Sequence, residues 1–365
     1  MQENELAREG ARVMAVCNAC RYCEQYCPAF QAMEQRLTFA TADLNYLANL
    51  CHGCGECLYA CQYAPPHEFA INVPKTFARL RVQSYEQYAW PAAFGAAFRR
   101  QGVWVALLLA FGLAALLLAA TVVLNGDLLL APGTAADFYA VVPHRIMATL
   151  FGGVGLFVLV ALAVGVVGCR RDFAAAPPHD GSGGRARAWH DIFTVRHLHV
   201  DGRDCVTALE VRTPWRRLLH HATFYGFLLC FASTCVATLY HLSGLPAPYT
   251  YSSAPVVLGT LGGLGLTIGA AGLLLHHRRR DAELSDPAQT GLDRAFLVLL
   301  LLTAVSGLLL LALRERAVMG VLLAAHLGIV LALFVSLPYG KLVHGLYRAA
   351  ALLKYRAHVE HRQAE

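Results

Sequence analysis

The sequence predicts an all-α membrane protein, in which a soluble N-terminal domain precedes a bundle of about six transmembrane helices. Of the 365 residues, 57% are hydrophobic and only 15% are charged, whereas ordinary soluble domains carry about 25% charged residues. Six runs of about 20 apolar residues follow residue 100, each long enough to cross about 30 Å of hydrocarbon. Eight of the twelve cysteines lie at regular spacing between Cys17 and Cys61, a pattern typical of metal binding. Soluble, disordered and disulfide-rich secreted proteins are therefore excluded.

Residues 1–73 form the first predicted unit, a cysteine-rich head with no apolar run long enough to span a membrane. Its opening segment, MQENELAREG, is charged, so we expect no signal peptide and a reducing, cytoplasmic location. Residues 74–100 are predicted to be an interfacial helix and linker, because Phe77, Leu80 and Tyr88 stand among basic and polar residues just before the first span. An amphipathic helix packed on the head explains the same pattern.

Residues 101–345 form the predicted transmembrane domain, with spans centred on 103–124, 145–168, 217–242, 255–275, 294–313 and 317–343. The net charge of +6 is spread too unevenly to indicate a nucleic-acid partner, but its distribution predicts the topology. Lys and Arg are absent from two connections, 125–144 and 243–254, whereas the polar loop at about 169–217 carries nine. Since basic loops stay inside, we predict an inner (cytoplasmic) membrane protein whose head, 169–217 loop, 346–365 tail and both termini are cytoplasmic. The main alternative is that the last two spans form one broken helix.

The cysteine spacing is the strongest chemical signal in the chain. The runs Cys17-x2-Cys20-x2-Cys23-x3-Cys27-Pro28 and Cys51-x2-Cys54-x2-Cys57-x3-Cys61 each have the spacing that binds a [4Fe–4S] cluster in bacterial ferredoxins, where the fourth cysteine ligates the other cluster. We therefore predict two [4Fe–4S] clusters with crossed ligation. Cluster 1 is assigned to Cys17, Cys20, Cys23 and Cys61, and cluster 2 to Cys51, Cys54, Cys57 and Cys27. A pair of zinc sites is the alternative.

The 23 residues between the two runs favour helices, because Leu37, Leu44, Leu47 and Leu50 recur at near-helical spacing. The head therefore resembles the helical ferredoxin module found in the iron–sulfur subunits of succinate dehydrogenase and heterodisulfide reductase. The other cysteines, Cys169, Cys205, Cys230 and Cys235, lack such spacing, and we expect them to be small apolar residues.

Several histidines lie in or beside the apolar runs, where an ionisable side chain predicts a function. The segment from His326 to His344 resembles the last helix of the gamma subunit of respiratory nitrate reductase, a cytochrome b. On that resemblance the transmembrane domain shares its architecture, and His344 ligates a b-type haem together with His220 or His221. A second haem at His326 has no partner at its depth in the third span, where Cys230 and Phe231 stand; His241 is the open alternative. Interfacial histidines that face lipid headgroups are the alternative to haem ligation.

Three segments together resemble the tricarballylate- or citrate-utilisation protein B family: the two cysteine runs, QYAPPHEFAINVPKTFARLR after the second run, and RRLLHHATFYGFLLCFAST in the third span. The resemblance implies an electron-transfer component rather than a stand-alone enzyme. It would reoxidise the reduced flavin of a partner FAD-dependent tricarballylate dehydrogenase and pass electrons through its clusters and haem to membrane quinone. No flavin or nicotinamide fingerprint is present, so the partner supplies the flavin. A quinone-linked reductase subunit with its own substrate site is the alternative, and a transporter or redox sensor is a third hypothesis.

Overall fold

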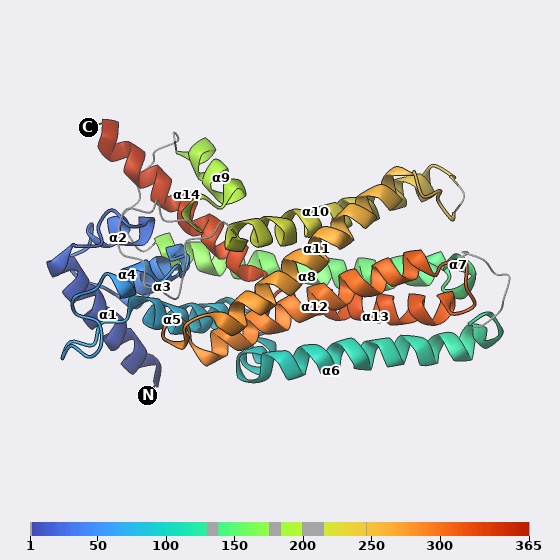
Figure 1. Cartoon of the computed structure of the whole chain (residues 1–365), viewed down its shortest axis with the longest axis horizontal. Helices are drawn as coiled ribbons and strands as arrows, with labels where there is room; N and C mark the ends of the chain where they lie inside the picture. Colours follow the sequence, from blue (N-terminus) through green and yellow to red (C-terminus); the bar gives the residue numbers. More distant parts are fainter. Residues whose placement is uncertain (1, 130–137, 175–183, 199–214, 246, 365) are drawn as a thin grey trace.

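The structure, a computed structural model, describes residues 2–129, 138–174, 184–198, 215–245 and 247–364. Within these residues it contains 14 α-helices and three short 3₁₀ helices and no strand. Figure 1 shows an elongated molecule in which the N-terminal helices form a head at one end and the long apolar helices run to the other. Both chain ends lie at the head. The predicted all-α fold with six candidate membrane helices is confirmed.

The head is built from five helices, α1 (Gln2–Cys20), α2 (Pro28–Met33), α3 (Thr41–Leu50), α4 (Glu56–Tyr59) and α5 (Val73–Tyr88). Their apolar faces meet in a core that includes Met14, Met33, Leu44, Leu47, Phe77 and Leu80, each at most 1% exposed. The sequence leaves two interpretations of the segment after residue 73 open, an interfacial helix and an amphipathic helix packed on the head. The structure supports the second, because side chains along one face of α5 fill this core. Residues 92–100 are helical, and a kink at Gln101 separates them from the long apolar part of the next helix.

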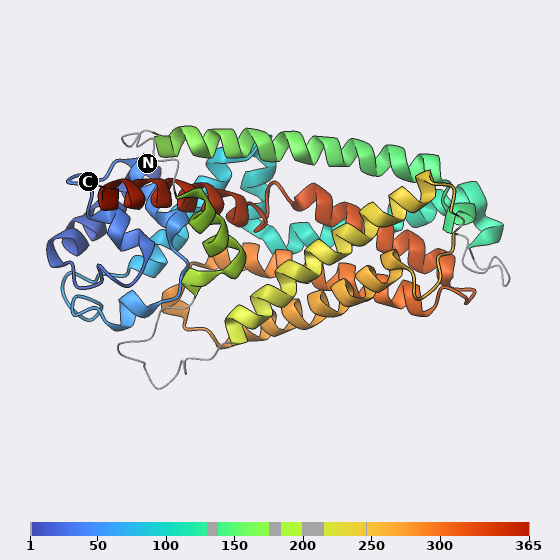
Figure 2. The ribbon, with the colours of Figure 1, turned by 90° about the horizontal axis from the view of Figure 1, so that it is seen from above.

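Six helices are long and apolar enough to span a membrane, as the sequence predicts. They lie within α6 (Ala92–Asn125), α8 (His144–Ala174), α10 (Trp215–Leu242), α11 (Ala254–Arg279), α12 (Pro287–Ala312) and α13 (Met319–Ser336). The short elements are η1 (Gly126–Leu128), α7 (Phe138–Val141), α9 (Arg185–Thr194), η2 (Arg196–Leu198) and η3 (Ala282–Leu284). Viewed from above, α8 runs along one edge of the bundle for almost its whole length (Figure 2).

Close contacts between helices depend on glycine. A Cβ atom on Gly328 of α13 would lie 2.3 Å from the Cα of Ala114 in α6, and one on Gly226 of α10 would lie 2.7 Å from the backbone of α11. Small residues at such positions let helix backbones approach within a membrane. The glycines at 152–155 of α8 meet nothing within 4 Å.

The turn between α12 and α13 keeps these two spans separate. Arg314 in this turn is only 7% exposed. It donates to the carbonyl of Tyr249 at 2.9 Å, and its guanidinium lies 3.7 Å from the ring centre of Tyr251. Arg314 therefore ties this turn to the 243–254 connection and is a structural cation there.

The last span ends earlier than we expected. The apolar run 317–343 predicted a continuous helix that would carry both His326 and His344, but α13 stops at Ser336, and α14 (Val343–Ala364) starts after a turn that contains Pro338 and Gly340. Proline removes a backbone donor and glycine weakens a helix, so the break follows from the sequence. The separation of about 27 Å that a continuous helix would give the two histidines no longer applies.

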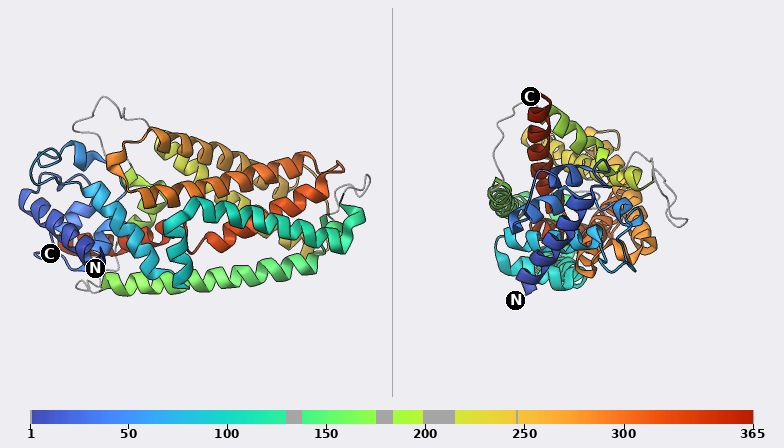
Figure 3. Two further views of the ribbon diagram at one scale, coloured as in Figure 1. Left: turned by 90° about the horizontal axis from the view of Figure 1, so that it is seen from below. Right: turned by 90° about the vertical axis from the view of Figure 1, so that its left-hand side faces the viewer.

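The predicted 346–365 tail is part of α14 and packs on the head. Tyr347, Leu352 and Tyr355 are at most 4% exposed and share one core with the head and with Phe173 of α8. The end-on view of Figure 3 shows the head covering this end of the bundle. Head and membrane helices are thus joined through a common hydrophobic core.

Candidate iron–sulfur site

The first cysteine run follows the end of α1. Cys17 and Cys20 lie in its last turn, and the chain then reverses at Arg21, whose positive φ of 55° is unusual for a residue with a side chain. Cys27 is the N-cap of α2, where Pro28 occupies the first helical turn. A proline is favoured at that position because its missing N–H is not needed there. The proline of the ferredoxin-type run thus starts a helix directly after the fourth cysteine.

The second run shares with the first a residue of positive φ directly after its second cysteine. Cys51 is the C-cap of α3, and Gly55 occupies the position equivalent to Arg21, with a φ of 94°. Gly53 also has a positive φ, of 61°. Glycine adopts this backbone conformation without strain. Cys57 lies in the single turn of α4, and Cys61 follows it.

The folded head places Cys61 of the second run near thiols of the first run, and Cys27 of the first run near thiols of the second. Cys17 interacts electrostatically with Cys20, Cys23 and Cys61. Cys27 in turn interacts with Cys51 and Cys54, and Cys57 with Cys51, Cys54 and Cys27. Cys57 also interacts with Cys23, so thiols of the two runs adjoin. A cavity of about 30 Å³ is lined by Cys17, Cys20, Cys23, Cys57 and Cys61.

The donor set fits iron–sulfur ligation. All eight cysteines are free thiols, Cys51 is buried and the other seven are half-buried. Burial and the neighbouring thiols raise the pKa of Cys17 and of Cys23 to about 12, so cluster binding would have to displace protons from these thiols. Backbone N–H groups of Ala29 and Phe30 donate to Cys27, which lowers its pKa against the effect of burial. Such donors stabilise electron-rich sulfur.

Among the described residues, no group of three or more His, Cys, Asp or Glu side chains is placed to hold a single metal ion. A preformed tetrahedral zinc site, with sulfurs about 2.3 Å from the metal, is thus not found in this part of the chain. The number of clusters stays a prediction.

Four arginines from different elements converge on the backbone of the second run. Arg81 of α5 donates to the carbonyls of Ala48 and Cys51 at 3.0 and 2.9 Å, and Arg348 of α14 donates to that of Cys51 at 2.9 Å. The carbonyl of Gly53 accepts from Arg216 of α10 and from Arg280, the C-cap of α11. We call Arg81, Arg216, Arg280 and Arg348 the arginine cluster. It joins the second cysteine run to the membrane helices.

Of the predicted haem histidines, the structure brings His220 and His344 together. Their ring centres are 6.3 Å apart and the rings are nearly perpendicular, at 84°. His344 Nδ1 contacts the carbonyl of Lys341, and His220 Nδ1 is buried with no hydrogen-bond partner among the described residues. His221 points elsewhere, since its Nε2 lies 3.2 Å from the carbonyl of Thr194 in α9.

His326 and His241 have different neighbours. His326 Nδ1 lies 2.8 Å from the hydroxyl of Ser306 in α12. His241 stacks on His144, with ring centres 3.9 Å apart, and Tyr139 lies against both rings. The structure therefore does not pair His326 with His241.

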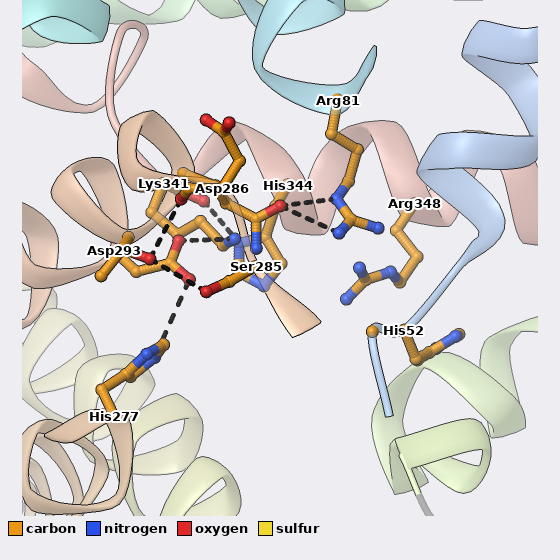
Figure 4. A network of polar contacts seen from close by, with 12 residues as sticks. His52, Arg81, His277, Ser285, Asp286, Asp293, Lys341, His344 and Arg348 are labelled. Atoms are coloured by element: carbon orange, nitrogen blue, oxygen red, sulfur yellow. Dashed lines mark hydrogen bonds and ion pairs between the residues drawn. The ribbon is translucent and has the colours of Figure 1, made fainter. Parts of the chain in front are cut away.

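Figure 4 shows a polar network beside His344 that the sequence analysis missed. Lys341 Nζ lies 2.6 Å from one carboxylate oxygen of Asp293 in α12, and His277 Nε2 of α11 lies 3.8 Å from the other. Asp293 is 7% exposed. Burial lowers the pKa of Lys341 to about 8, although Asp293 counteracts this. The sequence does contain a signal for this network: Asp293 is a single acidic residue at the start of an apolar run. Charged side chains buried in or beside a membrane span are usually paired, so a partner could have been expected.

The remaining cysteines are not grouped. Cys169 is buried in the core shared by head and bundle, Cys230 contacts α11 near Gly262, and Cys235 is exposed. Cys205 lies outside the described residues.

The fold and these residues define the class of the protein: a multi-pass helical membrane protein with an N-terminal ferredoxin-like domain. The profile of the "Citrate utilization protein B" family matches residues 99–365, and that of the "Citrate utilization protein B Fer4-like domain" matches residues 10–87. The chain is 52% identical over 349 residues to the citrate utilization protein B of Escherichia coli, covering 95% of this chain and 91% of that protein. The chain therefore belongs to the citrate utilization protein B family.

No solved structure matches the chain. The family resemblance drawn from the sequence is confirmed, whereas the likeness of the bundle to the nitrate reductase gamma subunit stays a prediction.

Proposed function

We propose that this protein is a membrane electron carrier that reoxidises the reduced flavin of a partner FAD-dependent dehydrogenase and delivers the electrons to membrane quinone. The dehydrogenase would act on tricarballylate or a related tricarboxylate, in keeping with the name of the E. coli relative. The observation that carries the proposal is the approach of each cysteine run to the fourth cysteine of the other, in a head whose second cysteine run is bonded to the membrane helices.

In this proposal the eight cysteines would hold two [4Fe–4S] clusters, which pass electrons one at a time between a flavin and a quinone that each exchange two. The protein itself fixes the positions of the thiols. The residues with positive φ, Arg21 and Gly55, change the direction of the chain within each cysteine run. The shared hydrophobic core holds the head against the bundle. The predicted membrane location places the bundle where quinone is dissolved.

The proposal includes one b-type haem, which His220 and His344 would hold. The ring centres of these two histidines are 6.3 Å apart, so both imidazoles could bind one metal ion. The contact of His344 Nδ1 with the Lys341 carbonyl leaves Nε2 as the ligand. The structure supports His220 over His221, because His221 is directed to α9.

The first test is a reduced-minus-oxidised absorption spectrum of the detergent-purified protein, with iron, acid-labile sulfide and haem measured on the same sample. We expect about eight non-haem iron and eight sulfide per chain and a sharp b-type α band. His344→Ala and His220→Ala should each abolish the α band and leave the sulfide unchanged. His221→Ala is the matched control and should retain the band.

The second test measures quinone reduction by the purified protein with a reduced FAD-dependent tricarballylate dehydrogenase as donor. Quinone should be reduced only when both proteins are present. Turnover of a small substrate without any flavoprotein would support the alternative, a reductase subunit with its own substrate site.

A further inference from the structure

The arginine cluster surrounds the backbone of only one of the two cysteine runs. Its four side chains come from α5, α10, the end of α11 and α14, and together they donate to the carbonyls of Ala48, Asn49, Cys51, His52 and Gly53. Arg81 is 2% exposed, and Arg348, Arg216 and Arg280 are half-buried. Four positive charges are therefore held within hydrogen-bond distance of the segment that carries Cys51 and adjoins Cys54.

Among the residues that the structure describes, Arg81, Arg280 and Arg348 form no ion pair with a carboxylate. Arg81 bonds the neutral side chain of Gln289 at 2.9 Å. Two negative carboxylates oppose this positive charge. Glu56 interacts with Cys54, and Asp293 interacts with Arg348, but Asp293 also pairs with Lys341. The positive charge also lies beside the cysteines themselves, because Arg348 donates to the backbone carbonyl of Cys51 at 2.9 Å.

The first run has a different environment. Its arginine, Arg21, is exposed and donates to the carbonyl of Asn18. Tyr22, next to it, is 59% exposed. Water and salt screen a charge at such a site, whereas a charge in a buried site acts at much greater strength.

Reduction adds one negative charge to an iron–sulfur cluster, so a buried cation nearby stabilises the reduced form and raises the reduction potential. We propose that the arginine cluster gives the cluster held by Cys51, Cys54, Cys57 and Cys27 a higher potential than the cluster held by Cys17, Cys20, Cys23 and Cys61. The inference rests on the proposed function.

The proposed difference in reduction potential would give electron transfer through the head a preferred direction. If the eight cysteines hold both clusters, an electron given up by the first would be taken up by the second, with no bond made or broken and no proton moved. The gradient therefore favours transfer toward the end of the head that bonds to α10, α11 and α14, where His220 and His344 lie. The exposed side of the first run is left to receive electrons from the partner.

The test is a redox titration of the detergent-purified full chain followed by EPR. Cys20→Ser and Cys54→Ser, which each alter one ligand set, assign the two signals. Arg216→Gln and Arg280→Gln each remove one charge from a half-buried side chain, and the corresponding Lys variants keep it. Arg79→Gln is the control. Arg79 lies on α5, as Arg81 of the cluster does, but its side chain is 51% exposed and pairs with Asp286.

We expect both Gln variants to lower the potential of the cluster assigned by Cys54→Ser and to leave the other unchanged, with the Lys variants close to the parent and Arg79→Gln without effect. If one Gln variant loses iron, the potentials of the other Gln variant and of the Lys variants are compared instead. Equal potentials in the parent, a shift of the first cluster, or no shift in either Gln variant would overturn the inference. Absence of both clusters from the parent would instead overturn the proposed function.

Discussion

Replacing Lys341 by methionine should destabilise the protein strongly, because it leaves the Asp293 carboxylate buried without its cation. At the observed 2.6 Å, the attraction of the pair is about 6 kcal/mol for an effective dielectric constant of about 20. Burial offsets much of this, as the lowered pKa of Lys341 indicates. Removing one partner of such a pair costs about 3–5 kcal/mol, whereas replacing both by apolar residues is often neutral.

The assay is SDS-induced unfolding of the detergent-solubilised protein, followed by circular dichroism. Lys341→Met should lose about 3 kcal/mol or more of unfolding free energy, and the double variant Lys341→Met/Asp293→Leu should recover most of it.

Lys75→Met is the matched control. Lys75 pairs with Glu283 at 3.1 Å, but the two side chains are 30% and 58% exposed, so the loss should be below about 1 kcal/mol. Equal losses for Lys341→Met and Lys75→Met, or a double variant as unstable as the single one, would refute the reasoning that burial makes the Asp293 charge costly.

Two further predictions concern packing and pH. Gly328→Val should destabilise the α6–α13 contact by about 1–3 kcal/mol, because its Cβ would overlap Ala114, while Gly152→Ala, in open space, should not change the melting temperature; equal effects would contradict this. Arg356→Met should speed hydrogen exchange in α9, because Arg356 bonds the buried Asp191 at 2.7 Å. Burial raises the pKa of Asp191, but Arg356 and His197 lower it by a larger amount, so the net shift of the pKa is downward. This stabilisation is complete above about pH 4 and is lost as the pH falls through the lower folded pKa; protection factors in the parent, corrected for the intrinsic exchange rate, that do not fall below about pH 4 would contradict it.

The sequence determined the architecture because its signals are local. Runs of apolar residues must be helical in a membrane, since no water satisfies their backbone groups, and all six runs became helices. The cysteine spacing likewise identified the eight thiols, because a CxxCxxC loop presents three sulfurs to one centre whatever surrounds it. The proline and glycine at 338 and 340 also marked the end of α13, although the apolar run hid that signal.

Only the tertiary structure decided which distant residues meet. His220, and not His221, faces His344, because α10 turns one of the two adjacent side chains toward α14 and the other toward α9. Asp293 of α12 meets Lys341 of the turn between α13 and α14. The arginine cluster gathers from positions 81 to 348 onto one loop. Sequence periodicity shows which face of a helix is apolar but not which partner that face meets, so contacts between residues far apart in the chain depend on how the helices pack.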